Sequence, residues 1–156
     1  MSEEVNDVIR AKRFELVNDE GQVRAVLEAR PEGNVGLWFV GASSTTIRAS
    51  LGISSDDVAL LNLFDEQQRL RANVVVDASG AQSIMSLRDE VGRAIVQLSH
   101  TKDLGAGVIV SNQWGHRRVA VQVNKEGHPS LLFFDEDGNV IGGEGPRPPS
   151  TGQDQG

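Results

Sequence analysis

The chain has 156 residues, which fits one domain with a single core. Its formal net charge of -7 argues against nucleic acid or an anionic membrane as the main partner, because both require a positive protein surface. The absence of cysteine excludes disulfides and thiolate metal sites. The acidic start does not resemble a signal peptide, and no run approaches the roughly 20 apolar residues of a membrane span, so we expect a cytoplasmic protein.

Taken in order, the sequence divides into three parts. Residues 1–9 form an N-terminal segment, and residues 4–11 are the one stretch that suggests a short helix. Residues 10–142 carry a repeated pattern and form a single predicted domain. Residues 143–156 have three prolines and no large apolar side chain, so they cannot offset their ordering entropy, and we predict a disordered tail.

The repeated pattern is a turn of the form Asp/Asn-x-x-Gly between two apolar-rich segments, which is typical of a β-hairpin. Clear copies span residues 18–21, 89–92, 112–115 and 135–138. A degenerate copy spans 65–68, and residues 41–44 occupy the remaining slot. The first residues of these turns step by 23 or 24 along the chain, and weaker turn signals lie midway between them. The sequence therefore predicts about six hairpins and about twelve short strands.

Apolar residues alternate before each turn. The residues two and four positions before the first residue of each turn are apolar in all six units. They are Phe14, Leu16, Leu37, Phe39, Leu61, Leu63, Met85, Leu87, Val108, Val110, Leu131 and Phe133. Because alternate residues of a strand share one face of a sheet, these positions predict a core face.

The strands that follow the turns also alternate, and on the side away from the apolar residues they open with arginine five times. These residues are Arg24, Arg48, Arg71, Arg93 and Arg118. Stacked in register, they form a candidate ladder for an anion or an acidic partner. Pairing with Glu28 and the turn carboxylates is the structural alternative, which we favour. The spacing at Gly92-Arg93 is two residues short, which suggests a tighter turn or a bulge there.

The phrase Phe14-Glu-Leu-Val-Asn-Asp-Glu-Gly-Gln-Val-Arg-Ala25 has an echo at residues 63–72. It resembles a mostly uncharacterised group of bacterial proteins built from tandem Leu-x-Asp-x-x-Gly-x-x-Arg-Ala hairpins. The resemblance covers residues 10–142. It implies an all-β repeat protein, and it transfers no catalytic residue.

Several all-β architectures fit six hairpins. The favoured ones are a quasi-repetitive prism, an irregular barrel or a stacked-hairpin array, because the units repeat at about 23 residues. A β-trefoil has the right strand number and is the alternative, but it should repeat best at twice that period. The second face of the first strands carries a further apolar set that needs a cover, and we predict it as a contact surface: Trp38, Val40, Phe64, Leu132 and Phe134.

Candidate chemical sites are weak. His100, His116 and His128 lack the spacing that aims two ligands at one metal, even with Asp103 or Asp135 nearby. Adjacent carboxylates at residues 65–66, 89–90 and 135–137 are predicted to face water at turn tips, which disfavours a catalytic pair of a general acid and a general base. Weak calcium binding at residues 135–137 is the remaining alternative. Trp38 or Trp114 could stack on a sugar ring, although packing is the favoured use.

These observations predict a protein without catalytic, cofactor or metal site. We expect a non-catalytic structural or assembly protein that contacts itself or another protein. A carbohydrate- or small-ligand-binding β module is the alternative.

Overall fold

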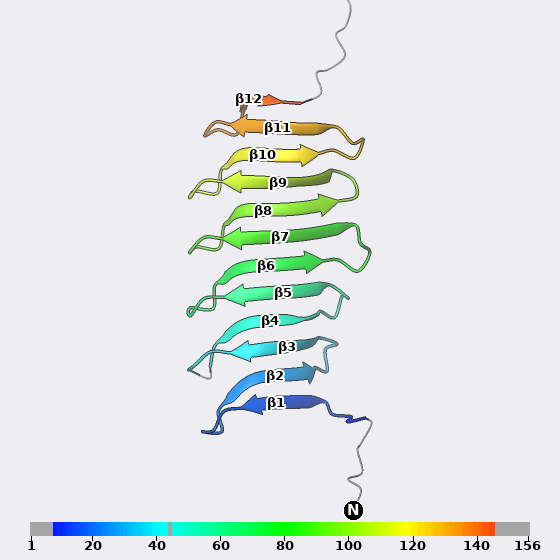
Figure 1. Ribbon diagram of the computed structural model, residues 1–156, viewed down its shortest axis with the longest axis vertical. Coiled ribbons are helices and arrows are strands. Elements are labelled where there is room, and N and C mark those ends of the chain that lie inside the picture. Colours follow the sequence, from blue (N-terminus) through cyan, green and yellow to red (C-terminus); the bar gives the residue numbers. More distant parts are fainter. Residues whose placement is uncertain (1–7, 44, 146–156) are drawn as a thin grey trace, which may run out of the picture.

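In the computed structural model, residues 8–43 and 45–145 form one open sheet of twelve antiparallel strands (Figure 1). The sheet is a meander in which each strand pairs with its neighbours in sequence, from β1 to β12. The strands are β1 (Arg13–Val17), β2 (Val23–Ala29), β3 (Val35–Val40), β4 (Ile47–Ile53), β5 (Ala59–Phe64), β6 (Leu70–Val76), β7 (Gln82–Arg88), β8 (Ala94–Thr101), β9 (Gly105–Ser111), β10 (Arg117–Val123), β11 (Pro129–Phe134) and β12 (Val140–Glu144).

The prediction of an all-β protein made of six tandem hairpins is confirmed. Among the expected architectures the structure is the hairpin array, while the barrel and the β-trefoil alternative are wrong, because β1 and β12 lie at opposite edges of the sheet. Strand β12 continues to Glu144, beyond the predicted boundary at residue 142. The predictions for residues 1–7 and 146–156 lie outside the described residues.

The side chain of the first turn residue explains the Asp/Asn preference. In the first hairpin the Asn18 Oδ1 accepts hydrogen bonds from the backbone N–H groups of Glu20 and Gln22, at 3.2 and 2.9 Å. The Asn18 N–H also donates to the Gln22 carbonyl. Such side-chain bonds hold the chain in a turn when no strand partner is available. Equivalent bonds, from the N–H groups two and four residues later in the chain, recur at Asp65, Asp89, Asn112, Asn124 and Asp135.

Among the residues that the structure describes, two turns place a residue other than glycine in the left-handed region. Asp57 has φ 58° and Gln68 has φ 62°. The Gln68 side-chain amide donates to the Ile47 carbonyl at 2.6 Å and accepts from the Ile47 N–H at 3.2 Å, which joins the third hairpin to the second. Gln68 thus gains contacts that glycine lacks.

Replacing Asp57 by glycine should therefore stabilise the protein by about 0.5 to 1 kcal/mol, since the left-handed conformation costs other residues about 1 to 2 kcal/mol and glycine's extra chain entropy offsets part of that. Gln68→Gly is the matched variant. It should give no gain, because it loses two hydrogen bonds worth about 0.5 to 1.5 kcal/mol each. Urea unfolding of both variants checks this, and equal gains would contradict it.

Every hairpin contains a β-bulge at the same place, next to the turn. In the first hairpin Val17 faces Val23 and Leu16 faces Ala25, so Arg24 is the extra residue. The same shift recurs in the other five hairpins, and the extra residues are Arg24, Arg48, Arg71, Ile95, Arg118 and Ile141. Bulges increase local twist and bend the strand that carries them.

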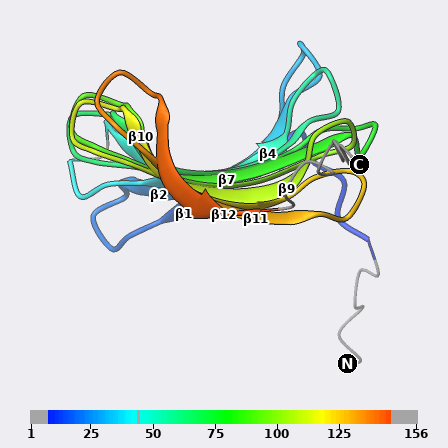
Figure 2. The ribbon, with the colours of Figure 1, turned by 90° about the horizontal axis from the view of Figure 1, so that it is seen from above.

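The sheet is bent, and the turns at both ends of the strands curve toward the same side (Figure 2). One face has a continuous apolar pattern, and we call it the apolar face. The other mixes apolar, polar and arginine residues, and we call it the mixed face. Side chains on the mixed face are the less exposed. Ala120 and Ser86 there are only 1% and 2% exposed.

The prediction that the apolar positions before the turns form the core is wrong for the isolated chain. Nine of those twelve residues are exposed, among them Leu16 at 66%. The buried apolar residues among those described are Ala25, Val26, Ala120 and Phe134. The physical reason is that a single sheet has no second layer to cover this face. Burial within one chain is therefore small.

Three turn aspartates link stability to pH. The Asp135 carboxylate accepts hydrogen bonds from the Asn139 side chain and from the Asn139 and Asp137 N–H groups, and these lower its pKa. At Asp65 and Asp89 partial desolvation raises the pKa, but hydrogen bonds and the adjacent Arg69 or Arg93 outweigh it, so the net shift of the pKa is downward.

Because the pKa values of these aspartates are lower in the folded state, their stabilisation is present above the unfolded pKa of about 3.9 and is lost as pH falls through the folded values. Asparagine at the three positions keeps the neutral acceptor, as Asn18 and Asn112 do. The triple variant Asp65→Asn, Asp89→Asn, Asp135→Asn should therefore lose less Tm than the parent between about pH 6 and about pH 3. Identical acid dependence of the two proteins would contradict this assignment.

Candidate interaction surfaces

The apolar face contains two columns of residues that lie opposite one another across all twelve strands. A third column, away from the bulges, crosses β2 to β11 and includes Val35, Ile53 and His100. The first column lies nearer the bulges and contains Leu16, Ala25, Phe39, Ala49, Leu63, Ala72, Leu87, Val96, Val110, Val119, Phe133 and Gly142. The second contains Phe14, Leu27, Leu37, Leu51, Leu61, Val74, Met85, Leu98, Val108, Val121, Leu131 and Glu144.

Charge is almost absent from the apolar face. Glu144, at the edge strand β12, is the one ionisable residue in the two columns. Many of the large side chains are half exposed or more, including Leu51 at 56% and Leu98 at 54%. Soluble monomers rarely expose contiguous apolar patches beyond a few hundred Å². This surface therefore has the composition of an interface or a core.

The first column also alternates in size. Its odd-numbered strands carry leucine, phenylalanine or valine, while its even-numbered strands carry mostly alanine or glycine. For example, Phe39 lies between Ala25 and Ala49. Apart from β8 to β10, where three valines lie side by side, the column is thus a series of ridges and grooves with a period of two strands, or roughly 9.6 Å at the usual strand spacing of about 4.8 Å.

The residues predicted as a contact surface lie on the mixed face. Trp38, Val40, Phe64 and Leu132 are half-buried, and Phe134 is buried. Their own neighbours cover part of them, since the guanidinium of Arg117 lies 5.3 Å from the centroid of the Phe134 ring. The apolar face, on the opposite side of the sheet, is therefore the better candidate for a contact surface.

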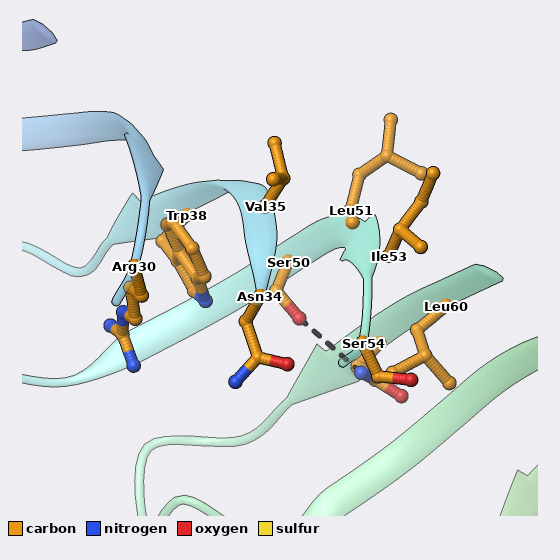
Figure 3. A pocket seen from close by; sticks show the side chains of 11 residues that line it. Arg30, Asn34, Val35, Trp38, Ser50, Leu51, Ile53, Ser54 and Leu60 are labelled. Atoms are coloured by element: carbon orange, nitrogen blue, oxygen red, sulfur yellow. Dashed lines mark hydrogen bonds between the residues drawn. The ribbon is translucent and has the colours of Figure 1, made fainter. Parts of the chain in front are cut away.

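Trp38 is held by packing within one corner of the mixed face (Figure 3). The Arg30 guanidinium lies 4.5 Å from the centroid of the indole, which is a cation–π contact. A Cβ on Gly36 would lie 3.1 Å from the Trp38 ring, so the ring rests against this glycine. Glu28 accepts hydrogen bonds from Arg13 and Arg30, each at 3.2 Å. Desolvation raises the pKa of Glu28, but these two bonds outweigh it, and the net shift is downward.

Arginines at the bulges connect successive hairpins. Arg48 Nε donates to the Phe64 carbonyl at 3.0 Å, and Arg71 Nε donates to the Arg88 carbonyl at 3.2 Å. Arg118 Nη1 makes the same contact with the Phe134 carbonyl at 3.3 Å. In each case the acceptor is the last residue of the next hairpin's first strand. The guanidinium groups are thus engaged in joining repeats. Of the expected carboxylate partners, Asp65 pairs with Arg71 at 3.4 Å and Glu136 with Arg118 at 3.3 Å, whereas Glu28 pairs with Arg13 and Arg30.

Arg24 also occupies a bulge, but Arg93 does not. Arg93 lies in the turn, where its N–H and Nε donate to the Asp89 carboxylate at 2.9 and 2.8 Å. The bulge position of this hairpin belongs to Ile95. The expected irregularity near Gly92 therefore arises because Arg93 corresponds to Arg69 of the preceding hairpin.

Polar side chains form a row across the middle of the mixed face. The Asn62 amide donates to the Ser50 hydroxyl at 3.3 Å (Figure 3), and the buried Ser86 hydroxyl donates to Asn73. A hollow of about 230 Å³ next to this row includes Trp38 and Asn34, while Val35, Leu51 and Ile53 point to the other side of the sheet.

A second hollow, of about 430 Å³, lies over β7 to β10 on the mixed face. Amide and hydroxyl groups of Gln97, Ser99, Thr101 and Gln122 line it. Gly107 adds no side chain to its floor, which leaves it open. Arg117 also lines it and adds one positive charge to these uncharged donors and acceptors, which suits a small polar ligand.

The candidate metal and acid/base residues stay apart. Among residues 8–43 and 45–145, no group of three or more His, Cys, Asp or Glu is placed to hold a metal ion. His100, His116 and His128 are all exposed. His116 and His128 lie in turns, where their backbone N–H groups donate to the Asn112 and Asn124 side chains, so these two positions serve the turns. Trp114 is exposed at a turn tip.

The fold and surfaces define a class of protein, a single-layer antiparallel hairpin-repeat sheet with one uncharged apolar face. Comparison with known proteins adds no family: neither protein-family models nor curated proteins give a match to the sequence. The described residues also contain no helix of the length and apolar character that crossing a membrane requires.

Sequence reasoning missed the exposure of the apolar face and the ridge-and-groove pattern on it. The signal for the second feature was present, because the first strands carry large residues at positions where the second strands carry alanine. Reading the pattern needed the strand register, which the bulges shift by one residue in every hairpin.

Proposed function

We propose that the protein is a non-catalytic structural or assembly component whose apolar face is covered by another protein surface. The observation that carries the proposal is this face, which crosses twelve strands, has almost no charge and is exposed in the isolated chain. Covering apolar surface yields about 25 cal/mol per Å², and many of the chain's exposed large apolar side chains lie on this face. The sheet therefore gains more from association than from contacts within one chain.

A structural role also agrees with where the recurring polar residues act. The turn carboxylates and amides close the turns, and three bulge arginines join one hairpin to the next. These groups are thereby engaged in holding the array together. What repeats on the outside of the array is the apolar face.

Labelling of single cysteines tests whether this face is covered. Leu51 lies on the apolar face and is 56% exposed in the isolated chain, while the adjacent Ser50 points to the mixed face and is half-buried. The cysteine-free parent gives no background. We expect Leu51→Cys to react with a maleimide more slowly than Ser50→Cys in the purified protein. Faster reaction of Leu51→Cys at every protein concentration would contradict the proposal.

The amide-lined hollow on the mixed face supports a second candidate function, binding of a carbohydrate or another small polar ligand. Glycan arrays and titration calorimetry test it. Binding should be lost in Gln97→Ala or Gln122→Ala and retained in Ser50→Ala, which alters the other hollow. Absence of binding to any glycan would remove this candidate and leave the structural proposal intact.

A further inference from the structure

We propose that the cover of the apolar face is the same face of a second copy, packed with the strand order reversed, so that β1 lies over the partner's β12 and β6 over the partner's β7. This inference rests on the proposed function and names the partner. A face with one ionisable residue among its two columns offers a partner of either charge nothing to pair with. A second copy is uncharged in the same places, so neither copy buries an unpaired charge over the middle of the sheet.

The area of the face is sufficient for a stable dimer. Twelve strands at about 4.8 Å spacing give a length of roughly 55 Å, and two columns of side chains with their flanks give a width of roughly 14 Å. The resulting area of roughly 770 Å² matches the roughly 800 Å² that each partner contributes to a standard interface. Both surfaces are more apolar than typical interfaces, as expected for permanent homodimers.

The ridges and grooves of the first column select the orientation. A two-fold axis that runs parallel to the strands, midway between β6 and β7, places strand n over the partner's strand 13 − n. Because the number of strands is even, every odd strand then lies over an even one. Leu87 meets the partner's Ala72, and Phe133 meets the partner's Ala25. Large residues thus face alanine or glycine in four of the six kinds of pair, while Phe39 and Leu63 face the partner's Val119 and Val96, which are smaller than they are.

The other two-fold arrangement has its axis along the stack of strands and places each strand over its own copy. This rotation also reverses the strand direction, so the first column lies over the partner's second column. Phe39 then meets the partner's Leu37, while Ala49 meets the partner's Leu51. The large pairs on the odd strands would hold the sheets further apart than the pairs on the even strands can fill, so this arrangement is disfavoured.

Cross-linking of single cysteines distinguishes the two arrangements. Ala49 on β4 and Val110 on β9 both belong to the first column. Within one chain they are five strands apart, about 24 Å, whereas in the reversed dimer each lies across the roughly 10 Å gap between packed sheets from the other. Ala49→Cys and Val110→Cys chains, refolded together, should be joined by a bismaleimide with a reach of about 10 Å, in an incubation long enough for the covered face to react. Mass spectrometry tells mixed from like pairs.

We expect mixed pairs to exceed like pairs by at least about tenfold, since only mixed pairs fall within reach. Ser50→Cys, one residue away on the opposite face, is the matched control and should not link to Val110→Cys. Ala49→Cys linked to itself would overturn the reversed order and leave the structural proposal standing. Light scattering that shows only monomers at about 100 μM, while Leu51→Cys stays protected, would overturn the second copy as occupant.

Discussion

Leu98→Glu should dissociate the assembly into single chains. The Leu98 side chain is 54% exposed in the isolated chain and lies near the middle of the apolar face, on β8. Replacement removes about 1.5 to 3 kcal/mol of apolar burial and leaves a carboxylate that costs several kcal/mol without a partner. Because each dimer contains the substitution twice, we expect the free energy of association to weaken by at least about 4 kcal/mol, which raises the Kd by about a thousandfold. Sedimentation equilibrium over a concentration series measures it.

Gln97→Glu is the matched control, because Gln97 is the adjacent residue of β8 and points to the mixed face. It introduces the same carboxylate and should leave the Kd within about threefold of the parent, as expected for a surface substitution of about 0.5 kcal/mol or less. Equal weakening by both substitutions would place the effect in the fold and not in the interface. Circular dichroism of both variants monitors the sheet.

A second substitution tests the reversed strand order through rescue. In that order Leu61 of β5 lies over the partner's Leu98. Leu61→Lys alone should weaken association as Leu98→Glu does. The double variant pairs lysine with glutamate across the interface and should recover part of the affinity, with a loss of recovery at high salt. Additive weakening in the double variant would contradict the pairing of β5 with the partner's β8.

Gly105→Ala, at the first residue of β9, should be more destabilising than the same substitution at the turn glycines. Gly105 has φ 98°, and a Cβ there would lie 2.0 Å from the Val123 carbonyl oxygen. The backbone conformation costs about 1 to 3 kcal/mol for a residue with a side chain, and the displaced strand adds about 1 to 3 kcal/mol. Thermal or urea unfolding should show that the free energy of unfolding falls by about 2 to 5 kcal/mol, or that the variant fails to fold.

Gly80→Ala separates the two contributions to that loss. Gly80 also has a positive φ, 69°, but a Cβ there meets no atom within 4 Å. This variant should lose only about 1 to 2 kcal/mol, the cost of the left-handed conformation. Equal losses in the two variants would show that the contact with β10 contributes nothing.

The secondary structure could be predicted from the sequence because its causes are local. A turn residue such as Asn18 closes its own turn through bonds to the next four residues, and alternate apolar residues mark one face of each strand. The strand order also followed, since short turns join neighbours. The position of Arg93 could not be predicted. In four other hairpins an arginine at the start of the second strand is the extra residue of the bulge, but Arg93 lies in the turn and the extra residue is Ile95.

Burial could not be predicted because it depends on layers and not on alternation. A period of two assigns Leu61 and Leu63 to one face, but it does not tell whether another sheet lies over that face. The low exposure of the mixed face arises in part from long side chains such as Arg30 and Arg117 that lie over aromatic neighbours. These features join residues of different hairpins, and a pattern within one hairpin does not reveal them.

The meander order has a consequence for how the chain folds. Since each strand touches only its sequence neighbours, no distant segments have to find one another, and a hairpin formed anywhere can grow by adding the next strand at little loop-closure cost. The same linearity means that opening starts at the outer strands and spreads inward one strand at a time, so the middle of the array is the last part to lose its hydrogen bonds.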